Sequence, residues 1–227
     1  MDNKTAILID GAFLIKRYQA LYGDLPEPNK LARAIRAASL QAMRAANRKN
    51  GTHRDLYRIL FYDCPPLDKR VQNPVSQKGL SLGKTEAAIY RIALHDELKK
   101  QRKIALRLGR LDGGKEWVMT PKSTKQILTG KKQLGELSQE DVRLEVKQKG
   151  VDIKIGIDIA SLAYKGLVNQ IILVAGDSDF VPAAKLARRE GVDFILDPMW
   201  NHINPDLHEH IDGLISGWQK PNQSTHQ

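Results

Sequence analysis

Short runs of apolar residues predict that the chain forms several strands buried on both faces. The runs cover residues 5–9, 56–62, 171–175 and 192–196. Uninterrupted runs of this kind are typical of parallel sheets, in which helices cover both faces. Two further strands, at 104–111 and 117–119, are predicted to pair around a turn at Asp112-Gly113-Gly114.

Apolar residues at helical spacing predict helices that alternate with these strands. The predicted helices cover residues 31–47, 85–103, 151–164, 182–189 and 205–215. Residues 71–83 are predicted to form a loop, and residues 121–132 an exposed loop or a short helix. The alternation of strands and helices predicts an α/β fold with a mostly parallel sheet.

Aspartates stand at the ends of two predicted strands. Asp10 ends the first strand, and Asp177 and Asp179 follow the strand at 171–175, with Ser178 between them. Ligands of open α/β sheets bind beyond the carboxyl ends of the strands, so parallel strands would bring Asp10 and Asp177 to one edge. A site for a positively charged ligand, most simply a metal ion, is therefore predicted at this edge.

Two more aspartates flank the start of the helix predicted at 151–164. Asp152 and Asp158 would lie about 240° apart around an ideal helix, so they would not share a face. If Asp152 instead is an N-cap or lies in the preceding turn, both carboxylates reach one cleft.

Clustered carboxylates need a neutralising partner. Two charges ~4 Å apart repel by about 4 kcal/mol at an effective dielectric of about 20, so the cluster takes up protons or binds a cation. Mg²⁺ and Mn²⁺ prefer such oxygen ligands, lower the pKa of bound water and stabilise the charge of an attacked phosphate. Each residue alone has a simpler explanation: a turn at Asp10, a helix cap at Asp152 or Asp179, and a solvated helix position at Asp158.

Other catalytic chemistries fit the chain less well. Ser178 lies outside a G-x-S-x-G motif, no P-loop is present, and the six histidines are scattered. Cys64 is the only cysteine, which excludes an internal disulfide and a thiolate zinc site. A haloacid-dehalogenase-like phosphatase would carry a D-x-D motif at Asp10, and a toprim-type site would carry a glutamate there.

The positive charge of the chain is concentrated in one segment. The formal net charge is +10, and residues 99–149 hold 14 lysines or arginines against 6 aspartates or glutamates, so +8 of the charge falls there. A nucleic-acid-binding surface and a solvated basic face without a partner explain this pattern about equally well. No apolar run reaches the ~18 residues of a membrane helix and no signal-peptide pattern is visible, so we expect a cytoplasmic protein without a membrane partner.

Three segments together resemble the NYN domain family. They are ILIDGAFL near the N-terminus, KGVDIKIGIDIASLAYKG in the middle and ILVAGDSDFVPAAKLARREGV near the end. The resemblance is to the LabA-like branch of this family, within the PIN-like nuclease superfamily, and it spans Thr5 to Pro198. It implies a three-layer α/β/α sandwich around a mostly parallel sheet, and cleavage of RNA that depends on Mg²⁺ or Mn²⁺.

The resemblance also implies which residues form the site. The implied catalytic cluster is Asp10, Asp152, Asp158 and Asp177, of which Asp10, Asp152 and Asp177 would bind the metal. Asp179 and Ser178 would support the cluster. Many family members carry an asparagine three residues after the first aspartate, where this chain has Phe13, so the resemblance does not carry over the geometry around the metal.

The resulting hypothesis is a divalent-metal-dependent ribonuclease, a hydrolase that cuts single-stranded or structured RNA. We expect a single domain over residues 1–215 with a basic insertion at about 99–149, followed by a polar tail at 216–227. The side chains expected to bind RNA are Lys122, Lys125, Lys131, Lys132, Lys149 and Trp117. Trp117 would stack on a base and Lys149 would hold a phosphate, although a core tryptophan is the more common case and a solvated lysine is nearly as common.

Two alternatives stay open: a non-catalytic RNA-binding or regulatory module on the same fold and, less favoured, a metal-dependent phosphatase. The sequence also leaves open whether DNA is accepted, whether cleavage is endo- or exonucleolytic, and whether the protein forms a homo-oligomer.

Overall fold

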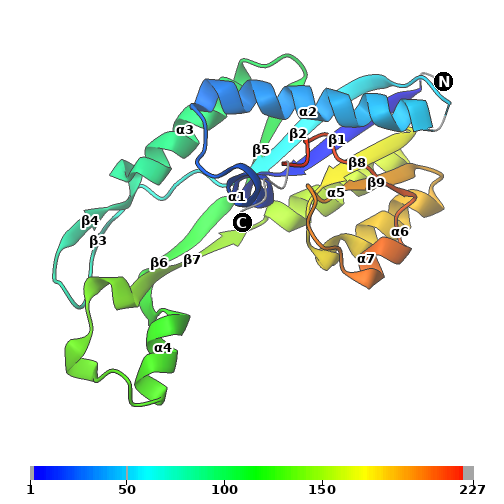
Figure 1. Cartoon of the computed structure of the whole chain (residues 1–227). Helices are drawn as coiled ribbons and strands as arrows, with labels where there is room; N and C mark the ends of the chain where they lie inside the picture. Colours follow the sequence, from blue (N-terminus) through cyan, green and yellow to red (C-terminus); the bar gives the residue numbers. More distant parts are fainter. Residues whose placement is uncertain (1–2, 50, 222–227) are drawn as a thin grey trace. The chain divides into compact units, whose positions relative to one another are not determined.

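The computed structural model describes residues 3–49 and 51–221, and the chain divides into two compact units (Figure 1). One, called the sheet unit here, contains the described residues up to 63, residues 93–109 and the described residues from 150 onward. The other, called the hairpin unit, contains residues 64–92 and 110–149.

A six-stranded parallel sheet forms the centre of the sheet unit. Its strands are β1 (Lys4–Asp10), β2 (Asp55–Asp63), β5 (Ile104–Leu108), β8 (Gln170–Val174), β9 (Asp193–Asp197) and β10 (Gly213–Leu214). They pair in the order β10-β9-β8-β1-β2-β5, and every pair is parallel. The apolar runs explain this arrangement, because all five residues of β8 and the central five of β1 are buried.

Helices cover both faces of this sheet. They are α1 (Gly11–Tyr22), α2 (Pro28–Lys49), the end of α3 (Glu86–Lys99), α5 (Val151–Tyr164), α6 (Val181–Arg189) and α7 (Pro205–Glu209). Figure 1 shows α2 along one face of the sheet and α5 and α6 along the other. The predicted α/β/α sandwich with a mostly parallel sheet is therefore confirmed.

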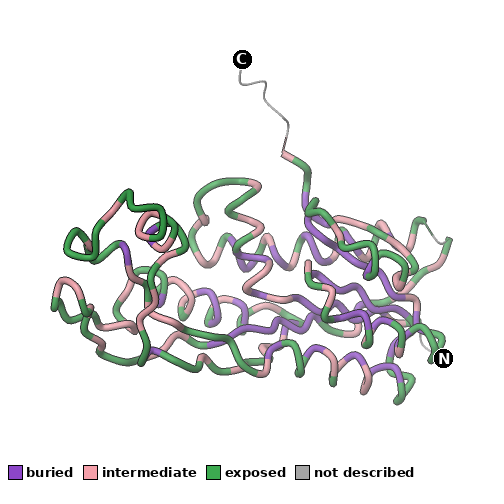
Figure 2. Tube along the Cα trace, turned by 90° about the horizontal axis from the view of Figure 1, so that it is seen from below, coloured by how far each residue is buried: buried purple, intermediate pink, exposed green. Residues whose placement is uncertain are grey.

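The core lies between these layers. Figure 2 shows buried residues concentrated along the central strands, with exposed residues on the outer turns of the helices. The stripe of α2 that faces the sheet contains Leu31, Ile35, Ala38 and Ala42, at the spacing of an amphipathic helix. Among the described residues, each helix is too short or too polar to cross a membrane.

The hairpin unit is built from two antiparallel strand pairs. Its elements are β3 (Arg70–Gln72), β4 (Gly79–Ser81), the 3₁₀ turn η1 (Leu82–Lys84), the start of α3, β6 (Arg110–Met119), α4 (Pro121–Leu128), the turns η2 (Leu134–Glu136) and η3 (Gln139–Asp141), and β7 (Val142–Lys149). β3 pairs with β4, and β6 pairs with β7.

One carboxylate holds the segment between β6 and β7 together. Asp141 accepts hydrogen bonds from Lys132 Nζ at 2.6 Å, Ser123 Oγ at 2.7 Å, and the backbone N–H and hydroxyl of Ser138 at 2.7 and 2.8 Å. The Lys132 ammonium, followed by the Ser138 N–H, lowers the pKa of Asp141. The network therefore ties α4 to the turn that precedes β7.

The predicted pairing of strands 104–111 and 117–119 is wrong. Residues 104–108 form β5, which lies parallel to β2 in the central sheet, and β6 begins at Arg110. Gly113 and Gly114 take positive φ angles of 118° and 70° at an irregularity within β6 instead of closing a turn. Glycines serve strand irregularities as readily as turns, which is why the pattern misled the prediction.

Two other element predictions also need correction, and one helix was not predicted. The loop predicted at 71–83 contains the short strands β3 and β4, whose turn is closed by Asn73 Oδ1 accepting two backbone N–H groups. The helix predicted at 205–215 ends at Glu209, because Asp212 accepts hydrogen bonds from Phe194 N and Arg188 Nε and thereby places β10 at the sheet edge. Helix α1 was not predicted, because its consecutive apolar residues lack a clear helical period.

The predicted polar tail lies partly outside the described residues, at 222–227. Its described beginning packs on the sheet unit. Gly217 N donates to Asp197 Oδ2 at 2.9 Å, and the Trp218 ring contacts Tyr18 with a centroid distance of 5.5 Å. Burial raises the pKa of Asp197, and the hydrogen bonds that it accepts from two backbone N–H groups offset part of this rise.

Gly11 provides a direct test of how β1 and α1 are joined. A Cβ on Gly11 would lie 2.6 Å from Phe61 Cε1 and 2.7 Å from the Tyr62 carbonyl oxygen. We expect Gly11→Ala to lower the free energy of unfolding by about 1–3 kcal/mol through overpacking. Gly156→Ala is the control, because that position in α5 faces open space and alanine should add up to about 1 kcal/mol there. Urea unfolding measures both, and equal effects would contradict the close approach at Gly11.

Candidate functional site

The carboxyl edge of the sheet gathers acidic residues from three adjacent strands. β1 lies between β8 and β2, and Asp10 pairs in register with Tyr62, directly before Asp63. Ile9 pairs with Val174 at the end of β8, three residues before Asp177. The expectation that parallel strands bring Asp10 and Asp177 to one edge therefore agrees with the strand register.

Asp10 ends β1 and is also the N-cap of α1. Its Oδ1 accepts hydrogen bonds from Ala12 N at 3.0 Å and Phe13 N at 3.1 Å. The simple turn considered for Asp10 is thus a helix cap, in which a negative charge is stabilised by the helix N-terminus. Because both bonds use Oδ1, the other oxygen, Oδ2, is available to a cation.

Asp177 makes an equivalent bond after β8. Its Oδ1 accepts from Asp179 N at 3.1 Å and caps the 3₁₀ turn η4 (Ser178–Phe180). The alternative that Asp179 caps the following helix is wrong, since the N-cap of α6 is Phe180 and has no side-chain cap. Gly176 permits close packing against Phe13, because a Cβ there would lie 2.4 Å from the Phe13 ring. The Phe13 ring therefore lies against the backbone directly before Asp177.

Asp152 and Asp158 both lie within α5 and do not share a face. The N-cap of α5 is Gly150, whose φ of 82° is left-handed, and Asp152 is the second helical residue. The expectation that Asp152 is the N-cap or precedes the helix is therefore wrong, because the glycine takes the special backbone position. The two carboxylates accordingly meet different neighbours.

Electrostatic repulsion links five carboxylates at the edge. Burial raises the pKa of Asp10, and the charges of Asp152 and Asp63 raise it further against the lowering effect of the two cap bonds. Partial burial also raises the pKa of Asp152, with further contributions from Asp177 and Asp179. Asp152 thus connects electrostatically to residues at the ends of both β1 and β8.

Asp158 is neutralised by neighbouring side chains. Arg107 donates from Nε to Oδ2 and from Nη2 to Oδ1, both at 2.9 Å, and the Tyr62 hydroxyl donates to Oδ2 at 2.8 Å. Burial, followed by the hydrogen bond to Asp158, raises the pKa of Tyr62, so its hydroxyl stays protonated. The role of Asp158 in the catalytic cluster remains a prediction.

A buried pair that sequence reasoning missed lies beside Asp10. His95 Nε2 and Asp63 Oδ2 are 2.7 Å apart, and both side chains are almost completely buried. The only sequence signal was the position of Asp63 at the end of a predicted strand. Its partner stands 32 residues away on α3, and no spacing rule connects the two.

The acidic edge suits a hard divalent cation, although it is not a closed cage. The aspartates supply oxygen ligands, and the caps leave Oδ2 of Asp10 and of Asp177 for binding. Within residues 3–49 and 51–221, a group whose ligand atoms all lie within 4.8 Å of one another is found elsewhere, at Asp206 and Glu209 of α7 and at His210, its C-cap. An ion at the edge would therefore use fewer direct protein ligands and retain waters, as Mg²⁺ commonly does.

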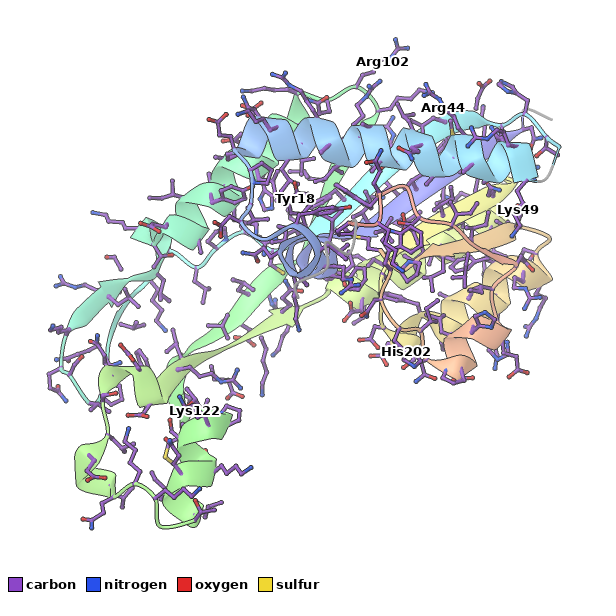
Figure 3. All side chains as sticks on the ribbon, in the orientation of Figure 1. Tyr18, Arg44, Lys49, Arg102, Lys122 and His202 are labelled. Carbon is purple, nitrogen blue, oxygen red and sulfur yellow. The ribbon has the colours of Figure 1, made fainter. Side chains whose placement is uncertain are left out.

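The residues expected to bind RNA belong to the hairpin unit. Lys122 and Lys125 on α4 and Lys131 after it are exposed, and Lys122 is visible in Figure 3. Two other predicted lysines are paired: Lys132 with Asp141 and Lys149 with Asp112. Trp117 is half-buried on β6. Their contact with RNA remains a prediction.

Comparison with known proteins gives the class of this chain. The NYN domain family matches residues 4–215, so the chain belongs to this family, which is part of the PIN-like superfamily and has a nuclease-like fold. A solved structure of a protein of unknown function from Vibrio parahaemolyticus is similar, with 14% sequence identity, a TM-score of 0.46, and coverage of 94% of this chain and 92% of that chain. No curated protein matches the chain.

Two substitutions at Asp10 distinguish the contribution of its helix cap to stability from that of its charge. In metal-free protein we expect Asp10→Asn to match or exceed the wild type in thermal stability, because asparagine caps helices as well and removes the repelled charge. Asp10→Ala should be less stable than Asp10→Asn by about 1 kcal/mol, because it also removes the cap.

The same variants have an expected pH dependence. A raised folded-state pKa means that the charge of Asp10 destabilises the fold as the pH rises above the unfolded-state value. The stability advantage of Asp10→Asn over the wild type should therefore shrink as the pH falls from about pH 7 to about pH 4. Thermal melts in EDTA across this range measure it, and a constant or reversed difference would show that burial and repulsion do not act on Asp10.

Proposed function

We propose that the protein is a divalent-metal-dependent ribonuclease that hydrolyses RNA phosphodiester bonds at the carboxyl edge of the sheet. The observation that carries this proposal is the placement of Asp10 and Asp177 at the carboxyl ends of the adjacent parallel strands β1 and β8. Asp152 of α5 is coupled electrostatically to both of these strand ends. Membership of the NYN family and the similarity of the three quoted segments to its LabA-like branch support it.

The side chains at the edge would have different roles in binding the metal. Asp10 and Asp177 would bind Mg²⁺ or Mn²⁺ through Oδ2, because their caps fix the carboxylates through Oδ1. Asp152 would complete the set, and Asp179 and Ser178 would support it. Once bound, the metal would activate a water and stabilise negative charge on the attacked phosphate.

The basic hairpin unit supports RNA as the substrate. Exposed lysines without acidic partners bind phosphates in a salt-dependent way that is largely independent of base sequence. Lys122, Lys125 and Lys131 fit this role, whereas Lys132 fixes Asp141 in its network. We therefore expect weak sequence preference and affinity that falls with ionic strength.

Cleavage of labelled single-stranded RNA tests the proposed reaction. We expect cleavage in Mn²⁺ and none in EDTA, and a loss of at least about 100-fold in the double variant Asp10→Asn/Asp177→Asn, since metal stabilisation contributes several kcal/mol. Asp24→Asn/Asp55→Asn is the matched control, because both residues are exposed and Asp55 begins β2 at the opposite edge.

The other outcomes identify the alternatives. RNA binding without metal-dependent cleavage would contradict the nuclease and favour a non-catalytic module. Release of phosphate from a small ester with the RNA left intact would favour a phosphatase.

The exposed lysines make a separate prediction about affinity. Replacing Lys122, Lys125 and Lys131 together by alanine should reduce the slope of log affinity against log salt by about 2 for single-stranded RNA. The control replaces Arg33, Arg44 and Lys49 by alanine, which removes the same charge from exposed positions on α2. Arg44 and Lys49 are labelled in Figure 3. Titration in EDTA measures both variants, and equal slopes would contradict a specific role of the hairpin-unit lysines.

A further inference from the structure

Arg107 stands at the same edge as the aspartate cluster, on the far side of β2. In the register of the sheet Arg107 pairs with Tyr62, which pairs with Asp10. The three residues thus form one row across β5, β2 and β1. Two strand spacings, roughly 10 Å, separate the backbones of Arg107 and Asp10.

Asp158 orients the Arg107 guanidinium, and the Tyr62 hydroxyl in turn holds Asp158 in place. Nε and Nη2 donate in parallel to the two carboxylate oxygens at 2.9 Å, and the Tyr62 hydroxyl holds Oδ2 at 2.8 Å. This bidentate geometry orients the planar guanidinium group, which an ammonium cannot reproduce. The Asp158 side chain is only 15% exposed, whereas that of Arg107 is 49% exposed.

The remaining donors of Arg107 are free to bind an anion. A guanidinium carries five N–H donors, and the contact with Asp158 uses two of them. The rest belong to a half-exposed side chain whose orientation is already fixed, so binding a second anion would require little additional ordering. At this edge, the anion expected from the proposed function is an RNA phosphate.

We infer that Arg107 binds a backbone phosphate of the RNA adjacent to the cleaved one, and that Asp158 is the positioning residue for Arg107 instead of a metal ligand. This inference rests on the proposed ribonuclease function and names one contact of its substrate. Asp158 has both oxygens engaged by a cation, while Asp10 and Asp177 each keep one oxygen free of their caps. The two groups of aspartates therefore serve different partners.

The direction in which Asp158→Asn changes the RNA affinity distinguishes a positioning role from a simple effect of charge. Asp158→Asn removes a negative charge, so general electrostatics alone predicts tighter RNA binding. Loss of orientation at Arg107 predicts weaker binding instead. Metal binding gives a second distinction, because a metal ligand loses Mn²⁺ affinity when it is replaced by asparagine, whereas a positioning residue keeps it.

The experiment measures RNA affinity and metal affinity separately on the full chain. Fluorescence anisotropy with a labelled single-stranded RNA in EDTA gives the first, and Mn²⁺ titration without RNA gives the second. The variants are Arg107→Ala, Arg107→Lys, Asp158→Asn and the double variant Arg107→Ala/Asp158→Asn. The control is Arg102→Ala, whose exposed side chain points away from the fold in Figure 3. Thermal melts identify variants that do not fold. If Arg107→Ala does not fold, Arg107→Lys still tests the contact, because it keeps the positive charge but lacks the planar guanidinium.

We expect Arg107→Ala and Asp158→Asn each to weaken RNA binding by about tenfold, the lower end for a charged hydrogen bond, with Arg107→Lys also weakened and Arg102→Ala nearly unchanged. The double variant should be no worse than Arg107→Ala, and Asp158→Asn should keep the Mn²⁺ affinity of the wild type. Equal affinities of Arg107→Ala and Arg102→Ala, or loss of Mn²⁺ affinity in Asp158→Asn, would overturn the inference while leaving the nuclease proposal intact. A wild-type protein that neither binds nor cuts RNA would overturn both.

Discussion

The parallel pairing of β1 with both β8 and β2 is the constraint on which the candidate site depends. It aligns the ends of three strands, so that Asp10, Asp63 and the Asp177 segment emerge at one edge. The core supports this pairing, because the central strands are apolar and buried on both faces. The fold thereby holds together like charges that would separate in an unfolded chain, and burial, followed by this repulsion, raises the pKa values of Asp10 and Asp152.

The structure controls this repulsion in a different way at each carboxylate. Backbone N–H groups at helix or turn starts stabilise Asp10 and Asp177, and a buried histidine accompanies Asp63. Asp158 receives an arginine and a tyrosine hydroxyl. We assign the metal to the β1 and β8 side of α5, because the caps of Asp10 and Asp177 use one carboxylate oxygen each, whereas both oxygens of Asp158 already accept from the Arg107 cation.

Much of the fold was predictable from local pattern, because buried parallel strands and amphipathic helices each leave a period in the sequence. The meeting of Asp10 and Asp177 followed from strand ends alone. The Asp63–His95 and Arg107–Asp158 pairs were not predictable, since 32 and 51 residues separate the partners. Each pair joins a strand residue to a helix residue that meets it only in the folded chain. The hairpin unit was misread where Gly113 and Gly114 form a strand irregularity, because glycine alone does not distinguish an irregularity from a turn.

The proposed reaction requires that a divalent cation binds at the carboxyl edge of the sheet. Anomalous diffraction from a crystal of the full chain soaked in Mn²⁺ tests this most directly. We expect an anomalous peak within coordination distance, about 2.1–2.3 Å, of carboxylate oxygens from Asp10 and Asp177. A fully occupied peak at Asp206, Glu209 and His210 with none at the edge, or no protein-bound peak at all, would contradict it.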